Sequence, residues 1–135
     1  DRAAALDTIR ITGTYDSCQA RSFAGFACRA KSGEGVFLDE ARVDSLNPRY
    51  IADLFDGVPG LRREGRNIVA TTGNRCVAYL FNGHPPMSIE AMGLSSLDAR
   101  DVLAVEFYAS ERTIPERYKV YARSCSLIVL WTTRE

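Results

Sequence analysis

Asp53 and Asp56 are the residues whose types and spacing most directly suggest chemistry. They lie three positions apart in the stretch 47–61, NPRYIADLFDGVPGL. On a helix this spacing would place two carboxylates on neighbouring turns of one face, as an acid/base pair requires. The apolar positions of the same stretch follow i, i+3, i+4 spacing and form a different face: Ile51, Leu54 and Phe55. We therefore interpret the carboxylates as the solvated face of a structural helix, with Asp53 directed to water or to an arginine.

Other patterns of catalytic or metal-binding residues are weak. His84 is the single histidine in the chain, and it lies in a turn before two prolines with no partner at metal-ligand spacing. The sequence contains neither a G-x-S-x-G nucleophile motif nor a glycine-rich phosphate loop. We expect an exposed turn histidine, no metal, no cofactor and no enzymatic activity.

Composition and charge exclude further classes of function. The 135 residues suit a single domain, and 17 basic residues balance 17 acidic ones. The basic residues are scattered, which argues against a nucleic-acid interface. The longest apolar run, Leu127–Trp131, is far shorter than a membrane-spanning helix. With no start methionine and no signal-peptide core, we expect a mature or excised piece of a longer protein.

The four cysteines are best explained as disulfides. Cys18, Cys28, Cys76 and Cys125 allow three pairings, and none has C-x-x-C spacing. Pairing by proximity predicts a short bridge from Cys18 to Cys28 and a long one from Cys76 to Cys125. By loop-closure entropy these contribute about 3 and about 4 kcal/mol, respectively. The long bridge therefore matters more to the fold, and a disulfide-permissive compartment is expected.

Short helices are expected in the first half of the chain. The spacing of apolar residues predicts one helix within Cys18–Lys31. Asp39 is a plausible N-cap for a second helix that ends at Leu46. The third helix is predicted to have Asn47 as its N-cap and Pro48 as its first residue, and to end before Gly57. Single helical turns are also expected at Asp98–Asp101 and Ile114–Tyr118.

Four stretches of the chain are typical of β-strands: 67–72, 76–81, 102–108 and 126–132. The first two are predicted to form a hairpin, and Asn82-Gly83 forms a turn after the second. The last strand is apolar on both faces, as expected for a central strand covered on two sides. We predict an α+β fold in which a small mixed sheet of these strands is packed by short helices at 39–56.

The order of these motifs resembles a known family. The chain contains N-P-x-x-I-x-D-L-F-x-x-V-P-G-L, then a Cys76 strand that ends in Phe81-Asn82-Gly83, then D-V-x-A-V-E-F-Y, then C-S-L-I-V-L-W-T. The succession, from Val36 to Thr132, resembles the plug domain of TonB-dependent outer-membrane receptors. It is most similar to the cysteine-containing variety found beside carboxypeptidase-regulatory-like domains. The chain has Asn82-Gly83 where family members often have Asp-Gly, and Cys125-Ser126 where they often have Cys-Gly.

The resemblance divides the chain into a segment at 1–13 and a plug-like domain at 14–135. Leu6–Gly13, LDTIRITG, is similar to the TonB box, which pairs with a TonB-like energising protein by strand addition. The residues of this TonB-box-like segment are Asp7, Thr8, Ile9, Arg10, Ile11 and Thr12. Its alternating β-branched residues suit that role, and they equally suit the first strand of the domain.

The resemblance also implies a function. It implies a non-enzymatic plug that gates a β-barrel from the same parent chain and contributes to ligand binding, in the bacterial periplasm or at the periplasmic side of the outer membrane. The loop Gly83–Ser96 is the candidate contact with an unknown ligand or partner, through Asn82, Gly83, His84 and Met87. An ordinary long connection explains this loop equally well. The alternative function is a stand-alone soluble periplasmic interaction module with a plug-like fold and no barrel.

Overall fold

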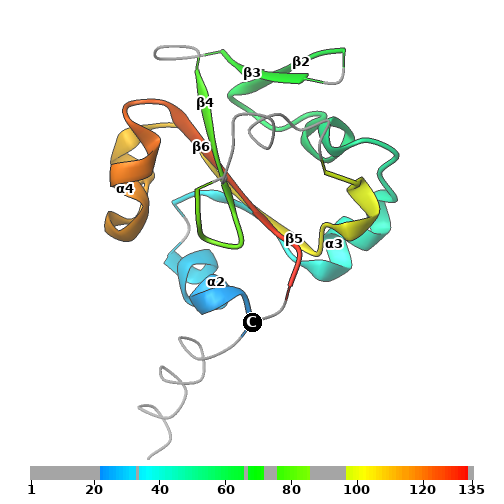
Figure 1. The fold of residues 1–135 in the computed structure, drawn as a ribbon, viewed down its shortest axis with the longest axis horizontal. Helices are drawn as coiled ribbons and strands as arrows, with labels where there is room; N and C mark the ends of the chain where they lie inside the picture. The colour runs from blue at the N-terminus through cyan, green and yellow to red at the C-terminus, as the bar shows by residue number, and fades with distance from the viewer. Residues whose placement is uncertain (1–21, 33, 66, 72–75, 86–96, 134–135) are drawn as a thin grey trace, which may run out of the picture.

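A computed structural model describes residues 22–32, 34–65, 67–71, 76–85 and 97–133 of the chain (Figure 1). The described elements confirm the α+β class. In chain order they are α2 (Ser22–Ser32), β1 (Val36–Leu38), α3 (Glu40–Leu46), η1 (Ile51–Phe55), β2 (Leu61–Glu64), β3 (Asn67–Ala70), β4 (Val77–Phe81), η4 (Ala99–Asp101), β5 (Ala104–Tyr108), η5 (Glu111–Thr113), α4 (Glu116–Ala122) and β6 (Ser126–Trp131). None of the described helices is long and apolar enough to cross a membrane.

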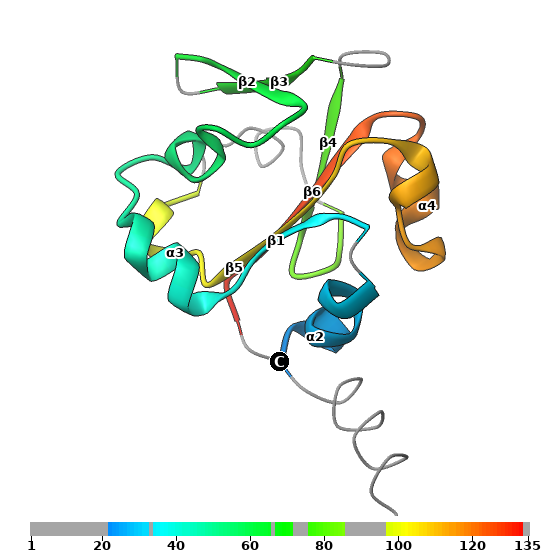
Figure 2. The same ribbon diagram turned by 180° about the vertical axis from the view of Figure 1, so that it is seen from behind.

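The main sheet has four strands in the order β1-β5-β6-β4. β5 is antiparallel to both β1 and β6, whereas β4 is parallel to β6. β2 and β3 form a separate antiparallel pair. Helices α2 and α4 lie on one side of the main sheet, and α3 lies on the other (Figures 1 and 2). The sheet is therefore mixed and covered on two sides.

β6 is the centre of this arrangement, as predicted from its apolar sequence. All of its residues are buried. Because successive side chains of a strand point to opposite faces, β6 supplies both halves of the core. Leu127, Val129 and Trp131 pack on the side of α2 and α4. Ile128 and Leu130 pack on the side of α3 and η1.

The hairpin predicted between 67–72 and 76–81 is wrong. β3 pairs instead with β2, a strand that the sequence pattern did not predict, and β4 joins the main sheet beside β6. β2 has the sequence LRRE, and its residues are half-buried or exposed. Because three of its four residues are charged, it lacks the apolar and β-branched residues by which strands are predicted. A parallel pairing across about fifty residues leaves no local turn signal that could have announced it.

The third helix also starts differently from the prediction. Asn47 has φ 46° and ψ 58°, and it ends α3 instead of capping the next helix. Its N–H donates to the carbonyl of Asp44 at 3.1 Å. Asparagine tolerates this left-handed conformation, so it suits the end of one helix as well as the start of another. The next element is a 3-10 helix that begins at Ile51, and Gly57, with φ +82°, follows it in the expected left-handed region.

Other local predictions are confirmed. The Asp39 side chain accepts a hydrogen bond from the backbone N–H of Arg42 at 2.9 Å and so caps α3. The short turn expected at Asp98–Asp101 is η4, and the turn expected at Ile114–Tyr118 becomes the first part of α4.

The disulfide between Cys76 and Cys125 is present as predicted, with a Cα–Cα distance of 4.9 Å. It lies directly before the parallel strands β4 and β6. The neighbouring Ser126 N–H donates to the Cys76 carbonyl at 3.1 Å. The bridge therefore fixes the register of the one parallel pair among the described strands, which no hairpin could fix.

Candidate functional site

A buried carboxylate cluster lies between α2 and the main sheet. Its centre is Glu106, in the middle of β5, whose side chain is 0% exposed. The carboxylate accepts four hydrogen bonds from three side chains. Arg29 of α2 donates through Nε at 2.8 Å and Nη2 at 2.6 Å. The Tyr108 hydroxyl donates at 2.5 Å and the Trp131 Nε1 at 2.7 Å.

Arg29 ties α2 to this cluster. Its side chain is 12% exposed, and its Nη2 also donates to the carbonyl of Phe23 at 3.0 Å. Burial alone would lower the pKa of the Arg29 guanidinium, but the hydrogen bonds and charge of Glu106 outweigh burial, and the pKa is raised. The guanidinium also lies 5.3 Å from the centre of the Tyr118 ring, within the range of a cation–π interaction.

Aromatic rings surround the cluster and exclude water. Neighbouring rings pack edge-on or tilted, at centroid distances of 5.4 to 6.5 Å. The rings belong to Phe23, Phe26, Phe37, Tyr108, Tyr118 and Trp131. Burial, followed by the charge of Glu106, raises the pKa of Tyr118 to about 12. The Tyr118 hydroxyl is buried here without a hydrogen-bond partner among the described residues.

The buried carboxylate cluster suits a structural role, in which it joins parts of the fold, and not a catalytic one. A general acid or base must reach a substrate, whereas both oxygens of Glu106 are occupied and closed off from solvent. Its bonds join three elements, α2, β5 and β6. One feature of the sequence could have indicated this cluster, although it was not used in the prediction. A glutamate in the middle of the apolar strand VLAVEFY needs a buried partner.

We expect Glu106→Gln to lower the free energy of unfolding by about 3 to 5 kcal/mol, because it removes the carboxylate charge that faces the buried guanidinium of Arg29. Urea denaturation at neutral pH measures the loss. The control is Glu116→Gln, at a side chain that is 91% exposed, which should leave the urea midpoint unchanged. The double variant Arg29→Met/Glu106→Gln should be more stable than Glu106→Gln alone. A Glu106→Gln protein as stable as the wild type would contradict this account.

The carboxylates Asp53 and Asp56 both contact Arg63, which lies on β2. Arg63 Nη1 lies 2.5 Å from Asp53 Oδ1 and 3.1 Å from Asp56 Oδ2. The other oxygen of Asp53 accepts the backbone N–H groups of Arg49 and Tyr50, each at 2.8 Å. Of the two expectations for Asp53, water or an arginine, the structure has the arginine. Through Arg63, these two carboxylates fasten η1 to β2.

Asp53 is held in its ionised form. Hydrogen bonding from the Tyr50 N–H, with further contributions from Arg63 and Arg49, outweighs burial and lowers the pKa of Asp53 below its usual value. A carboxyl held ionised in this way is a poor general acid. The hydrogen bonds explain both the position and the charge of Asp53 without a catalytic role.

The lowered pKa of Asp53 predicts a pH dependence of stability. Because the pKa is lower in the folded state, the stabilisation is complete above the unfolded-state pKa of about 3.9 and is lost as pH falls through the folded-state value. At neutral pH, Asp53→Asn should cost up to about 1 kcal/mol, the range of a partly exposed ion pair, because it removes the charge that faces Arg63. Urea midpoints measured from about pH 7 to pH 2.5 should converge with those of the wild type in acid. The exposed Asp101→Asn is the control, and a pH-independent difference for Asp53→Asn would contradict the assignment.

The predicted turn at Asn82-Gly83 is confirmed. Both residues have positive φ, 56° and 83°, and the flanking Phe81 and His84 exchange backbone hydrogen bonds at 2.7 and 3.0 Å. The Asn82 side chain binds Thr132, with Oδ1 accepting from the backbone N–H at 2.7 Å and Nδ2 donating to Oγ1 at 2.9 Å. Asn82 therefore ties the turn to the end of β6, and it is His84 that is exposed to solvent.

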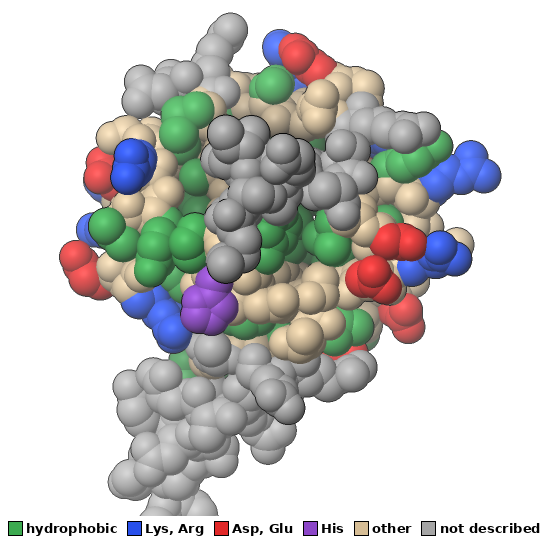
Figure 3. All heavy atoms as spheres, in the orientation of Figure 1, with side chains coloured by type: hydrophobic (Ala, Val, Ile, Leu, Met, Phe, Trp, Pro, Cys, Tyr) green, Lys and Arg blue, Asp and Glu red, His purple; other side chains and the backbone are tan. Residues whose placement is uncertain are grey.

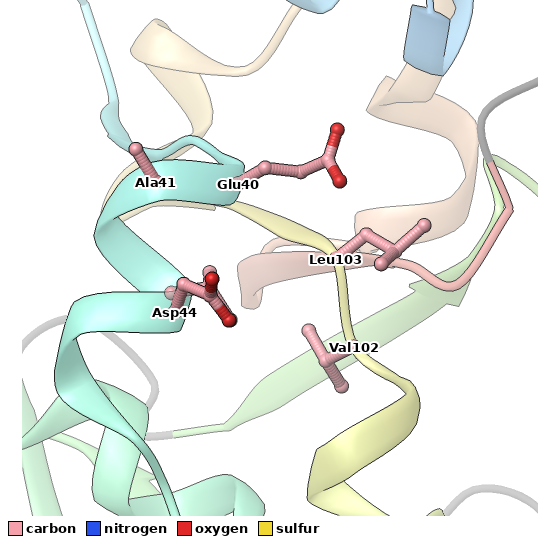
Figure 4. A pocket seen from close by; sticks show the side chains of 6 residues that line it. Glu40, Ala41, Asp44, Val102 and Leu103 are labelled. Carbon is pink, nitrogen blue, oxygen red and sulfur yellow. The ribbon is translucent and has the colours of Figure 1, made fainter.

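A polar hollow lies beside α3. Figure 4 shows the Glu40 and Asp44 side chains of α3 directed toward the space next to Val102 and Leu103. The hollow has a volume of about 470 Å³. Among the described residues, no three His, Cys, Asp or Glu side chains gather in a way that could hold a metal ion. The two carboxylates give this hollow negative charge but no assembled site.

Several predicted site residues lie outside the described residues. They are the TonB-box-like residues Asp7 to Thr12, Cys18, and Met87 with most of the loop 83–96. Cys28, on α2, is disulfide-bonded, and its predicted partner is Cys18. Cys28 directly precedes Arg29, so its disulfide is attached to α2 next to the residue that anchors that helix.

Comparisons of the chain with protein-family models and with curated proteins found no match. The function is therefore inferred from the residues themselves and from where the fold places them.

Proposed function

We propose that this chain is a non-enzymatic plug, or plug-like, domain of a TonB-dependent outer-membrane transport system. In this role it occludes a barrel and contributes to ligand binding. The observation that carries the proposal is the placement of the ordered motifs V-E-F-Y and C-S-L-I-V-L-W-T, which with the D-L-F-x-x-V-P-G turn are the most specific parts of the resemblance. V-E-F-Y lies on β5 and S-L-I-V-L-W on β6, and the two strands are adjacent, with Glu106 opposite Val129.

The third motif belongs to the same core. D-L-F-x-x-V-P-G places Leu54 and Phe55 against one face of the sheet, where they are 2% and 4% exposed. Gly60, which ends the motif, has φ +94° and lies against the Phe107 ring of β5. Motifs about fifty residues apart thus form one packed unit, which supports reading them as parts of a single family pattern.

The buried carboxylate cluster suits a domain that is pulled from its N-terminus. In the chain, the segment 7–12 precedes α2, and α2 is joined to β5 and β6 through Arg29 and Glu106. A force applied to that segment would reach α2 first and load this ion pair next. The Cys76–Cys125 bridge would keep β4 and β6 together after α2 had detached.

The proposal predicts that the chain binds the periplasmic C-terminal domain of a TonB-like energising protein. Ile9→Pro should reduce this binding at least tenfold, because proline removes a strand-forming N–H from the TonB-box-like segment. Ala4→Pro, outside that segment, is the matched control and should bind like the wild type. Isothermal titration calorimetry measures both variants. Equal affinities for the two variants, or no binding by the wild type, would contradict the proposed partner.

A second candidate is a stand-alone interaction module that keeps the plug-like fold without a barrel. The observation that favours it is the exposure of large apolar side chains, Val120 at 70% and Tyr121 at 41%, because such residues often mark an interaction surface. The parent reading frame separates the two candidates. Several hundred downstream residues with an alternating β pattern would support the receptor, and a stop codon soon after Glu135 would support the module.

A further inference from the structure

β4 is an edge strand of the main sheet among the described strands: the described strand beside it is β6, and on its other side the described pairing is that of Phe81 with His84 in the turn that follows. The Cys76 carbonyl and the Asn82 N–H both bond to the β6 side. Backbone groups of a strand alternate in direction, so Ala78 and Leu80 also face β6, whereas Val77 and Tyr79 face away from it. Their N–H and C=O groups form a row that another strand could pair with.

A groove runs beside this edge. We call it the β4 groove, and its lining residues are Val77, Ala78, Tyr79, Pro85, Val120, Tyr121 and Arg123. Its volume is about 580 Å³. Hydrophobic side chains reach the surface on the side of the molecule where α4 lies (Figure 3). The groove thus joins exposed apolar side chains of α4 to the outward backbone groups of β4.

One end of the β4 groove carries a positive charge. Arg123 is exposed, and no described residue forms an ion pair with it. It lies two residues before Cys125, whose bridge to Cys76 places it near the start of β4. Pro85 lines the groove after the turn that follows β4. Among the described residues that line the groove there is no carboxylate to neutralise the charge of Arg123.

We propose that the β4 groove binds an extended peptide segment of another protein by strand addition. The segment pairs antiparallel to β4, presents apolar side chains to Val120 and Tyr121, and places a carboxylate near its C-terminal end opposite Arg123. Antiparallel pairing is the more stable arrangement per residue, and it puts the C-terminal end of the segment at the Val77 end of the groove. The backbone pairing supplies affinity and the groove side chains supply selectivity.

Charge argues for a different protein over a second copy of this chain. Two β4 grooves facing each other would bring together two apolar surfaces and two Arg123 side chains, with no carboxylate from the described lining residues between them. A segment of another protein with an acidic end complements the groove in three ways: through its backbone groups, through its apolar side chains and through its charge.

The test is amide hydrogen exchange of the full chain, measured by NMR with and without a synthetic peptide. The peptide alternates valine and threonine and ends in aspartate. At saturation, exchange at Val77 and Tyr79 should slow at least tenfold, whereas exchange at Ala78 and Leu80, already bonded to β6, should stay unchanged. No protection at Val77 and Tyr79 would overturn the proposal. Protection of the same amides without peptide, increasing with protein concentration, would also overturn it in favour of a second copy.

Charge variants give an independent readout. Arg123 has φ 50°, a conformation that asparagine tolerates, so Arg123→Asn removes the charge with little backbone strain. It should weaken binding of the aspartate-ended peptide about two- to fivefold, the range of an exposed ion pair, and Arg123→Lys should largely retain binding. When both peptides carry a C-terminal amide, which removes the α-carboxylate, the peptide that ends in asparagine should bind both variants and the wild type equally. Equal binding of the aspartate-ended peptide to Arg123→Asn and wild type would overturn the assigned role of Arg123.

Discussion

The buried charge of Glu106 is the constraint on which the rest of the structure depends. A carboxylate removed from water costs several kcal/mol unless hydrogen bonds and an opposite charge compensate it. Here the compensation comes from a helix, from the same strand and from the neighbouring strand, through Arg29, Tyr108 and Trp131. The sheet therefore cannot be completed on that face without α2. A single charged residue links the beginning of the described chain to its end.

The two faces of the sheet are held by different means. The α2 face combines the buried carboxylate cluster with packed aromatic rings, whereas the other face is aliphatic and is closed by α3, η1 and the β2–β3 pair. The Asp53–Arg63 ion pair fastens that second layer at a partly exposed position. Exposed ion pairs contribute little to stability, whereas removal of one partner of a buried pair is strongly destabilising. The α2 face is therefore more sensitive than the other face to a single polar substitution.

The sequence predicted those features whose cause is local or compositional. β6 was recognisable because a strand covered on two sides is apolar throughout, and Asn82-Gly83 because its turn needs two positive φ angles. The Cys76–Cys125 bridge followed from counting and proximity. Pairings between distant segments were not predictable: β4 looked like a hairpin partner of β3, and the parallel contact with β6 has no local signature.

The same distinction explains what was predicted of the candidate sites. Asp53 was expected to face water or an arginine, but Arg63 could not be chosen from fifteen arginines by sequence alone. Glu106 is a charge inside an apolar strand, but this signal was not used in the prediction, and its partner Arg29 lies 77 residues away. The N–H and C=O groups of Val77 and Tyr79 face away from β6 because of the strand order, which the sequence does not reveal.

The central claim is that the Arg29–Glu106 pair holds α2 on the sheet. Native-state hydrogen exchange of the α2 amides tests it most directly, in the wild type and in Arg29→Met/Glu106→Gln. The account predicts that α2 amides of the wild type exchange as slowly as those of β5 and β6, and that in the double variant α2 loses protection while β5 and β6 keep theirs. Rapid exchange of α2 in the wild type, or undiminished protection in the double variant, would contradict it.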